Sequence, residues 1–261
     1  MRWARFRSSD GRIGFGVFED AHISEYEGDL YGMPRPTGRT LAHGSVTLLS
    51  PCTPSKIVAL WNNFHALREK LGKPPPLHPL FLIKPSTSVI GTDEPILRPA
   101  GYAGKIAYEG ELGIVIGKHC KNISPDEARA HIFGYTCYND VTRGDFYEEG
   151  AFGRSPYFVY GKTYEGFAPM GPYVVTDLDP SNLHLECRIN GEVRQSHSTS
   201  DRLFTPEQLV SFVSHLGTLN PGDVISCGSP PGMSWMNDGD VCEIEIEGIG
   251  VLRNHVRARA G

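Results

Sequence analysis

The chain alternates between short apolar runs and clusters of Gly and Pro, a pattern that predicts mostly β structure. Its 30 Gly and 20 Pro residues lie between runs rich in Val, Ile and Tyr, as expected for strands joined by turns. The first 50 residues are predicted to form a small β region, with one strand in GRIGFGVFED and a later one in GSVTLLSP. The pattern predicts further strands at residues 56–61, 107–118, 133–140 and 241–250.

Two short helices are predicted between these strands. FHALREKLGK (64–73) follows two asparagines and is expected to end at Gly72, just before three prolines. SPDEARAHIFG (124–134) begins with Ser124 at the N-cap and has Glu127 at the position that completes a capping box. The mixture of many strands and few helices indicates a mainly β, α+β fold.

The last part of the chain contains an irregular segment and a clear hairpin signal. Residues 141–172 show little periodicity, and a long irregular stretch inside a compact domain is usually a functional loop or lid. Within it Lys162 follows an aromatic run, which is compatible with a protected ammonium or with an ordinary surface lysine. Residues 183–204 predict a hairpin with Asn190 and Gly191 at its turn.

Two acid-rich strands show the same alternation. In AYEGELGIVIGK, Glu109 and Glu111 are two residues apart, so both carboxylates lie on one face of the predicted strand. In VCEIEIEGIG the same spacing joins Glu243, Glu245 and Glu247. A solvent-facing strand face explains either pattern. We interpret the second strand as solvent-facing because no partner residue for its glutamates is evident.

Asp140 distinguishes the first strand from the second. It ends the apolar run FGYTCYND, and a carboxylate at a strand end is well placed to contribute to a site. Crowded carboxylates repel one another unless a cation neutralises them. A third oxygen ligand that meets Glu109 and Glu111 would therefore indicate a metal site.

Composition narrows the classes of function. The net charge is -5 and Lys and Arg are dispersed, so nothing indicates binding to nucleic acid or to an anionic membrane. The aliphatic runs are too short to span a bilayer, and the N-terminus lacks the apolar region of a signal peptide, so we expect a soluble, cytoplasmic protein. Six cysteines without C-x-x-C spacing predict buried, reduced thiols.

Five segments resemble, in order and spacing, the motifs of the fumarylacetoacetate hydrolase family. They are YEGELGIVIGK, GYTCYND, GKTYEGFAPMGP, INGEVRQSHST and LNPGDVISCGSPPGM. The resemblance runs from about residue 57 to the C-terminus. It implies a mixed β-roll catalytic domain at residues 56–261, after a small N-terminal β region at residues 1–55, and it implies a homodimer.

The resemblance also implies a divalent metal, Mg²⁺ or Mn²⁺, held by Glu109, Glu111 and Asp140. An anionic shell of oxygen ligands suits such hard cations, whereas zinc would favour His or Cys. The metal site implied by the resemblance would explain why two glutamates occupy an otherwise apolar strand.

Other site residues follow from the same resemblance. Lys162 matches a lysine that stabilises negative charge as it develops. Gln195, Thr199 and Ser229 match substrate-binding positions, with serine where the family usually has threonine. Asp145 matches the last residue of the family's N-D-x-T-A-R-D motif, another substrate-binding position.

Two departures from the family pattern concern catalysis and recognition. His65 matches the histidine of an N-x-x-H segment that acts as general base, but the acid usually found three residues later is replaced by Arg68, and Glu69 follows at four. Both spacings lie on one helix face, so Glu69 remains a candidate partner. A packing or capping role for His65 also stays open. Arg143 stands one position earlier than the family's arginine, which affects substrate recognition.

These assignments lead to three hypotheses. The first is a hydrolase that cleaves a carbon–carbon bond in a β-diketo or 2-oxo acid of the fumarylacetoacetate or acylpyruvate type, with His65, Glu69 and Lys162 as catalytic residues. The second is an isomerase, decarboxylase or hydratase acting on an unsaturated 2-hydroxy or 2-oxo dicarboxylic acid of aromatic catabolism. The third is a catalytically silent member of the family that binds metal and an oxo acid.

Overall fold

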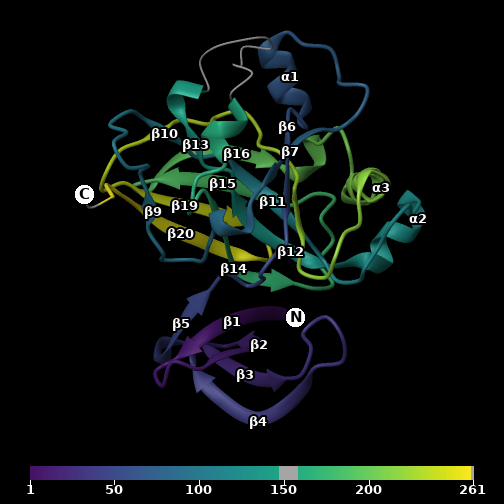
Figure 1. Cartoon of the computed structure of the whole chain (residues 1–261), viewed down its shortest axis with the longest axis vertical. Helices are drawn as coiled ribbons and strands as arrows, with labels where there is room; N and C mark the ends of the chain where they lie inside the picture. The colour runs from purple at the N-terminus through teal and green to yellow at the C-terminus, as the bar shows by residue number, and fades with distance from the viewer. Residues whose placement is uncertain (147–157, 260–261) are drawn as a thin grey trace.

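The computed structural model of the chain describes residues 1–146 and 158–259. The molecule is elongated, with the N-terminal strands at one end of its long axis and helix α1 (His65–Leu71) at the other (Figure 1). Residues 147–157, which belong to the irregular segment with its predicted loop or lid, lie outside the described residues. Within the described part of the chain, no helix is long and apolar enough to cross a membrane.

The largest sheet has twelve strands and includes strands from both the N-terminal region and the rest of the chain. In spatial order ten of them are β4 (Arg35–Ala42), β3 (His22–Glu27), β2 (Ile13–Glu19), β1 (Arg2–Ser8), β14 (Ala168–Val175), β12 (Ile132–Asn139), β11 (Gly110–Ile116), β17 (Val224–Ser226), β6 (Ile57–Trp61) and β7 (Leu80–Lys84). The other two are β5 (Val46–Leu49), which pairs with β1, and β8 (Val89–Ile90), which pairs with β14.

Two smaller sheets complete the β structure. One contains β13 (Thr142–Arg143), β10 (Ile106–Ala107) and β18 (Trp235–Met236). The other contains β16 (Glu192–Ser198), β15 (His184–Ile189), β19 (Val241–Ile246), β20 (Gly250–Arg257) and β9 (Ile96–Leu97). Strands of this second sheet pack against β11, β12 and β14. Because β11 also lies in the middle of the large sheet, all of its residues are buried.

The helices are short and begin and end at residues suited to those positions. In α2 (Pro125–Ala128) both hydrogen bonds of the predicted capping box between Ser124 and Glu127 form. In α3 (Pro206–Leu216) Thr205 and Gln208 form a second one. Helix α1 ends at Gly72, whose φ of 61° is left-handed and costs glycine little. Both predicted helices are therefore confirmed, although the second is one turn long.

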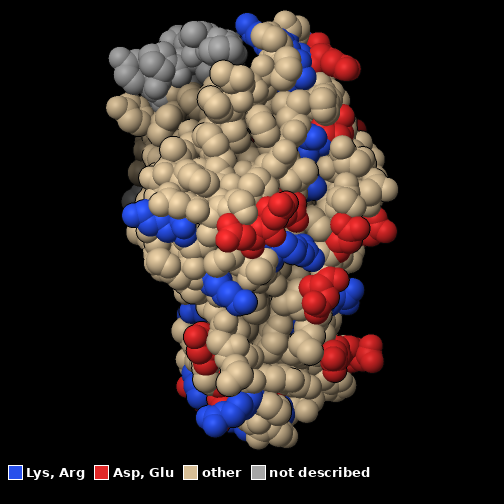
Figure 2. Space-filling model, turned by 90° about the vertical axis from the view of Figure 1, so that its right-hand side faces the viewer, with Lys and Arg blue, Asp and Glu red and all other residues tan. Residues whose placement is uncertain are grey.

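Most predicted strands are also confirmed. In the hairpin of β15 and β16, Ile189 pairs with Glu192, which leaves Asn190 and Gly191 as a two-residue turn with φ of 53° and 80°. Strand β1 was not predicted, although it joins the N-terminal strands to β14. The six cysteines are free and buried, as expected. On the face shown in Figure 2, acidic and basic side chains are intermixed, so this face has no large patch of one sign.

Candidate metal and substrate site

Three carboxylates converge where β11 and β12 lie side by side. The strands are antiparallel with Gly110 opposite Asn139, so Glu109 and Asp140 are adjacent, and the amide of Asp140 donates to the carbonyl of Glu109 at 2.9 Å. Glu111, two residues along β11, points to the same side. One oxygen from each of Glu109, Glu111 and Asp140 lies within 4.8 Å of the others.

These carboxylates do not lie on a solvent-exposed face of their strands. Glu109, Glu111 and Asp140 are 4%, 0% and 1% exposed. Gly110, between the two glutamates, leaves room for the opposing sheet, because a Cβ there would lie 2.0 Å from Sγ of Cys187. The strand is thus covered closely on the face opposite the carboxylates.

Only part of the hydrogen-bonding capacity of Glu111 is used. Its Oε2 accepts from the Ser226 hydroxyl at 2.5 Å and from the Gly228 amide at 2.8 Å. Its Oε1 is buried and has no partner among the described residues. Tyr138 lies directly opposite Glu111 on β12, and its hydroxyl is also buried without a partner among the described residues. Buried polar atoms are rarely left unpaired, so this position suits a further ligand.

Two buried lysines compensate part of the negative charge. The ammonium of Lys162, at the end of a 3-10 turn (Phe158–Lys162), contacts Asp140 Oδ2 and lies 3.2 Å from Glu109 Oε2. The ammonium of Lys84, at the end of β7, donates to Asp140 Oδ1 at 2.5 Å and to the Phe167 carbonyl at 2.6 Å. Both lysines are fully buried. Lys162 was expected at the site from the sequence, but Lys84 was not, because its only signal is a charged residue at the end of an apolar run.

The pKa shifts follow this arrangement. Burial, with the nearby charges of Asp140 and Glu109, raises the pKa of Glu111 well above its usual value. Burial would also raise the pKa of Asp140, but Lys162 and Lys84 outweigh it and lower that pKa. Burial lowers the pKa of Lys84 despite the charge of Asp140. Without a further cation, the cluster therefore favours a proton on Glu111.

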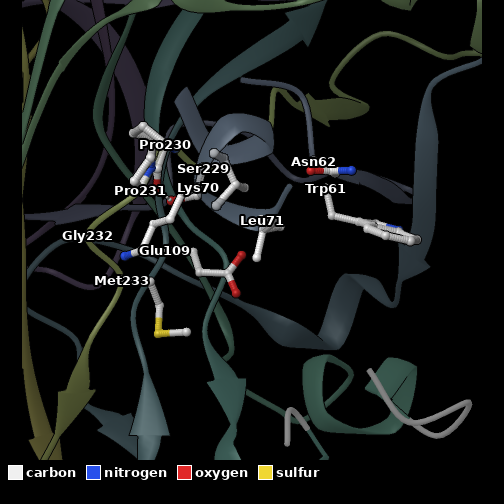
Figure 3. A pocket seen from close by; sticks show the side chains of 11 residues that line it. Trp61, Asn62, Lys70, Leu71, Glu109, Ser229, Pro230, Pro231, Gly232 and Met233 are labelled. Carbon is white, nitrogen blue, oxygen red and sulfur yellow. Dashed lines mark hydrogen bonds between the residues drawn. The ribbon is translucent and has the colours of Figure 1, made fainter. Parts of the chain in front are cut away.

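One of the three carboxylates, Glu109, lines a pocket of about 170 Å³. Its lining comes from the end of β6, from α1 and from the loop before β18: Trp61, Asn62, Leu67, Lys70, Leu71, Glu109, Ser229, Pro230, Pro231, Gly232 and Met233 (Figure 3). Figure 3 shows the side chain of Lys70 extending from α1 toward Gly232 and Met233. Lys70 was not expected in the pocket from the sequence, because the pattern did not show which face of this short helix is turned inward.

The face of helix α1 that lines the pocket is not the face that carries His65 and Glu69. Leu67, Lys70 and Leu71, at i, i+3 and i+4, share the face that lines it. His65 and Glu69 are exposed, and neither lines this pocket. Their roles as base and partner stay predictions.

Gln195 braces the pocket wall. Its amide nitrogen donates to the Ser229 hydroxyl at 3.0 Å and to the Pro230 carbonyl at 2.8 Å, and its oxygen accepts from the Gly110 amide at 3.3 Å. It thereby ties the strand that carries Glu111 to the loop that contains Ser229. Tyr108 adds a hydrogen bond of 3.0 Å to the Gly232 carbonyl.

Two other residues that were predicted to bind substrate, Thr199 and Asp145, contact protein groups outside this pocket. The Thr199 hydroxyl donates to the Pro180 carbonyl and accepts from the Leu183 amide, both at 2.8 Å, and it lines a separate pocket. Asp145 forms a two-pronged ion pair with Arg143 at 2.7 and 2.8 Å. Their contact with substrate stays a prediction.

The second acid-rich strand has a partner, contrary to expectation. Arg188 on β15 forms ion pairs with Glu243 at 3.2 Å and Glu245 at 2.8 Å, besides one with Glu186. The side chain of Glu243 is only 26% exposed, and that of Glu245 is 48% exposed. The interpretation of this strand as without a partner was wrong, because the cation comes from the neighbouring strand rather than from nearby sequence.

The donor set around Glu111 fits a hard divalent cation. It consists of three carboxylates with an unpartnered buried oxygen, and it contains no His or Cys among the described residues. Three carboxylates and two ammonium groups sum to about -1, so a divalent cation would leave about +1 for an anionic ligand.

A family model described as fumarylacetoacetate (FAA) hydrolase C-terminal matches residues 56–257. A second model, described as Rv2993c-like, N-terminal, matches residues 1–51.

Similar proteins differ in their named activities. A solved structure from Mycobacterium smegmatis named 5-carboxymethyl-2-hydroxymuconate delta-isomerase has a TM-score of 0.89 and 38% identity, covering 99% of this chain and 100% of that chain. Maleylpyruvate hydrolase from Sphingobium sp. SYK-6, in complex with manganese(II) and pyruvate, has a TM-score of 0.80 and 26% identity, covering 100% of both chains. A mitochondrial oxaloacetate tautomerase from Xenopus laevis is 35% identical over 83% of this chain and 70% of that protein.

Proposed function

The chain belongs to the fumarylacetoacetate hydrolase family, and on that basis we propose that it is a divalent-metal-dependent isomerase or tautomerase of a 2-oxo acid and its 2-hydroxy enol form. The observation that carries the proposal is the convergence of three buried carboxylates below a pocket whose α1 face presents Leu67, Lys70 and Leu71. Keto–enol interconversion needs a stabilised enolate, but it needs no nucleophilic water.

Glu109, Glu111 and Asp140 would hold the metal, either Mg²⁺ or Mn²⁺. A divalent cation bound there would polarise the substrate's 2-oxo carbonyl as a Lewis acid. The manganese(II) and pyruvate named for the Sphingobium hydrolase structure are consistent with a 2-oxo acid at this position.

Side chains around the metal ligands would stabilise the negative charge of the reacting substrate and hold the site in place. Lys162, between Asp140 and Glu109, is a fixed buried cation that would stabilise the negative charge on the oxygen of an enolate form of the substrate. Lys84 would hold Asp140 in place from its other oxygen. Gln195 would keep the loop of Ser229 at the right distance from the metal-site strand.

The hydrolase hypothesis remains the second candidate, supported by the structural similarity to maleylpyruvate hydrolase. It requires a base that activates water, and His65 with Glu69 is the pair assigned to that task. Both side chains are exposed on α1 outside the pocket lining. Hydrolysis would therefore need α1 to turn or shift.

A substrate panel tests the proposal. The chain would be assayed with Mg²⁺ or Mn²⁺ on enol and keto oxaloacetate, unsaturated 2-hydroxy dicarboxylic acids, acylpyruvates and fumarylacetoacetate-like diketo acids, with absorbance and products followed together. We expect isomerised or tautomerised products of unchanged mass. Cleavage of acylpyruvates to two acids would support the hydrolase instead, and metal binding without any turnover would support the catalytically silent member.

Two further expectations stay predictions. The homodimer implied by the resemblance would be tested by sedimentation of the purified chain. The cytoplasmic location would be tested by cell fractionation.

A further inference from the structure

Lys70 is one of two charged residues among the described residues that line the pocket, and the other is Glu109. Glu109 belongs to the carboxylate cluster, whereas the side chain of Lys70 extends from α1 toward Gly232 and Met233 (Figure 3). Within the described part of the chain, no ion pair is found for Lys70. The exposed Lys70 ammonium is therefore available to a ligand in the pocket.

The wall between these two charges is largely apolar. Leu67 and Leu71 come from α1, and Met233 and Pro231 come from the loop on the other side. A ligand held at the floor by its 2-oxo acid end would therefore run a carbon chain past these side chains. Its far end would reach the Lys70 ammonium, whose flexible stem can adjust to it.

We propose that Lys70 binds a carboxylate at the distal end of the substrate, so that the pocket selects 2-oxo dicarboxylic acids over 2-oxo acids with an uncharged end. This inference rests on the proposed function, because it takes the 2-oxo acid end to lie at the carboxylate cluster. Lys70 is thus a residue that determines specificity, and a lysine that is merely solvated would show no such selection.

A matched pair of stable probes tests the proposal. 2-Oxoglutarate and 2-oxopentanoate have the same chain length and the same 2-oxo acid end, but the first ends in a carboxylate and the second in a methyl group. Binding of each to the Mn²⁺-loaded chain is measured by calorimetry. We expect 2-oxoglutarate to bind about two- to fivefold more tightly, because Lys70 is exposed and an exposed ion pair contributes only modestly to binding.

Three variants test whether Lys70 causes the preference for 2-oxoglutarate. Lys70→Met keeps the apolar stem and should bind the two probes equally, whereas Lys70→Arg should retain the preference. Lys121→Met removes an exposed lysine elsewhere and should behave like the unaltered chain. Thermal melts confirm that each variant is folded.

The possible outcomes separate the two proposals. If both probes bind the unaltered chain with equal affinity, or if Lys70→Met keeps the preference, the role of Lys70 is overturned while the oxo-acid site stands. If neither probe binds the Mn²⁺-loaded chain, the oxo-acid site is overturned and the role of Lys70 with it.

Discussion

Two strands of this protein carry the same alternation of glutamate and apolar residues, yet they place their carboxylates in opposite environments. Glu109 and Glu111 are buried with Asp140 against two buried lysines, and one oxygen of Glu111 has no partner among the described residues. Glu243 and Glu245 lie near the surface, where Arg188 pairs with both. Alternation thus predicts which side chains share a face of a strand. The residues packed against that face determine whether its carboxylates are buried or exposed.

The largest expected difference concerns the cation in each cluster. Lys162→Met would leave Glu109 and one oxygen of Asp140 without a buried counter-charge, so it should lower the free energy of unfolding of the metal-free protein by about 3–5 kcal/mol. Arg188→Met, the matched change at the surface, should lower it by about 1 kcal/mol. Urea unfolding of both variants measures this, and equal losses would remove the distinction between the two clusters.

The next prediction concerns metal binding. Glu111→Gln should weaken Mn²⁺ binding by on the order of 10²-fold or more, because even residues that only support metal ligands cost about 10- to 100-fold. Glu245→Gln makes the same chemical change on the other strand and should leave Mn²⁺ affinity unchanged. Calorimetric titration decides this, and normal Mn²⁺ binding by Glu111→Gln would exclude the carboxylate cluster as the metal site.

A pH dependence should accompany the burial of Glu111. Because burial raises the pKa of Glu111 in the folded state, the folded metal-free protein holds a proton that the unfolded chain releases near pH 4.3. Stability should therefore decrease as pH rises above that value, by at most about 1.4 kcal/mol per pH unit. Melts between pH 5 and pH 8 measure the decrease. It should be smaller in Glu111→Gln, and a decrease of the same size in both proteins would show that another group causes it.

The smallest effect is expected at His65. Its side chain is exposed and does not line the pocket, so His65→Ala should change turnover by less than about threefold. Glu69→Gln should have as little effect. A loss of roughly 10²-fold to 10⁴-fold in His65→Ala, with folding and Mn²⁺ binding intact, would instead establish a general base and favour the hydrolase.

Local signals in the sequence predicted local structure well. The capping box of Ser124 and the turn at Asn190 and Gly191 depend on residues a few positions apart, and both form as predicted. Strand alternation placed Glu109 and Glu111 on one face and left Asp140 as a candidate, and the family resemblance implied that the three meet, as they do in the structure.

The missed features depend on neighbours that are distant in sequence. Lys84 reaches Asp140 across 56 residues, and Arg188 reaches Glu243 across 55. For α1, the sequence predicted a helix but not its rotation about its axis. That rotation decides whether His65 or Leu67 faces the pocket, and it is set by tertiary packing rather than by the seven residues themselves.

Gly110 has a consequence for how this protein can evolve. A Cβ at position 110 would lie 2.0 Å from the sulfur of Cys187, so an alanine would push apart two sheets that hold the acidic residues in register. An alanine at position 187 would remove that sulfur and create the missing space. The two positions should therefore change together among descendants of this sequence, and a lineage that acquires the smaller residue at 187 first becomes free to lose the glycine.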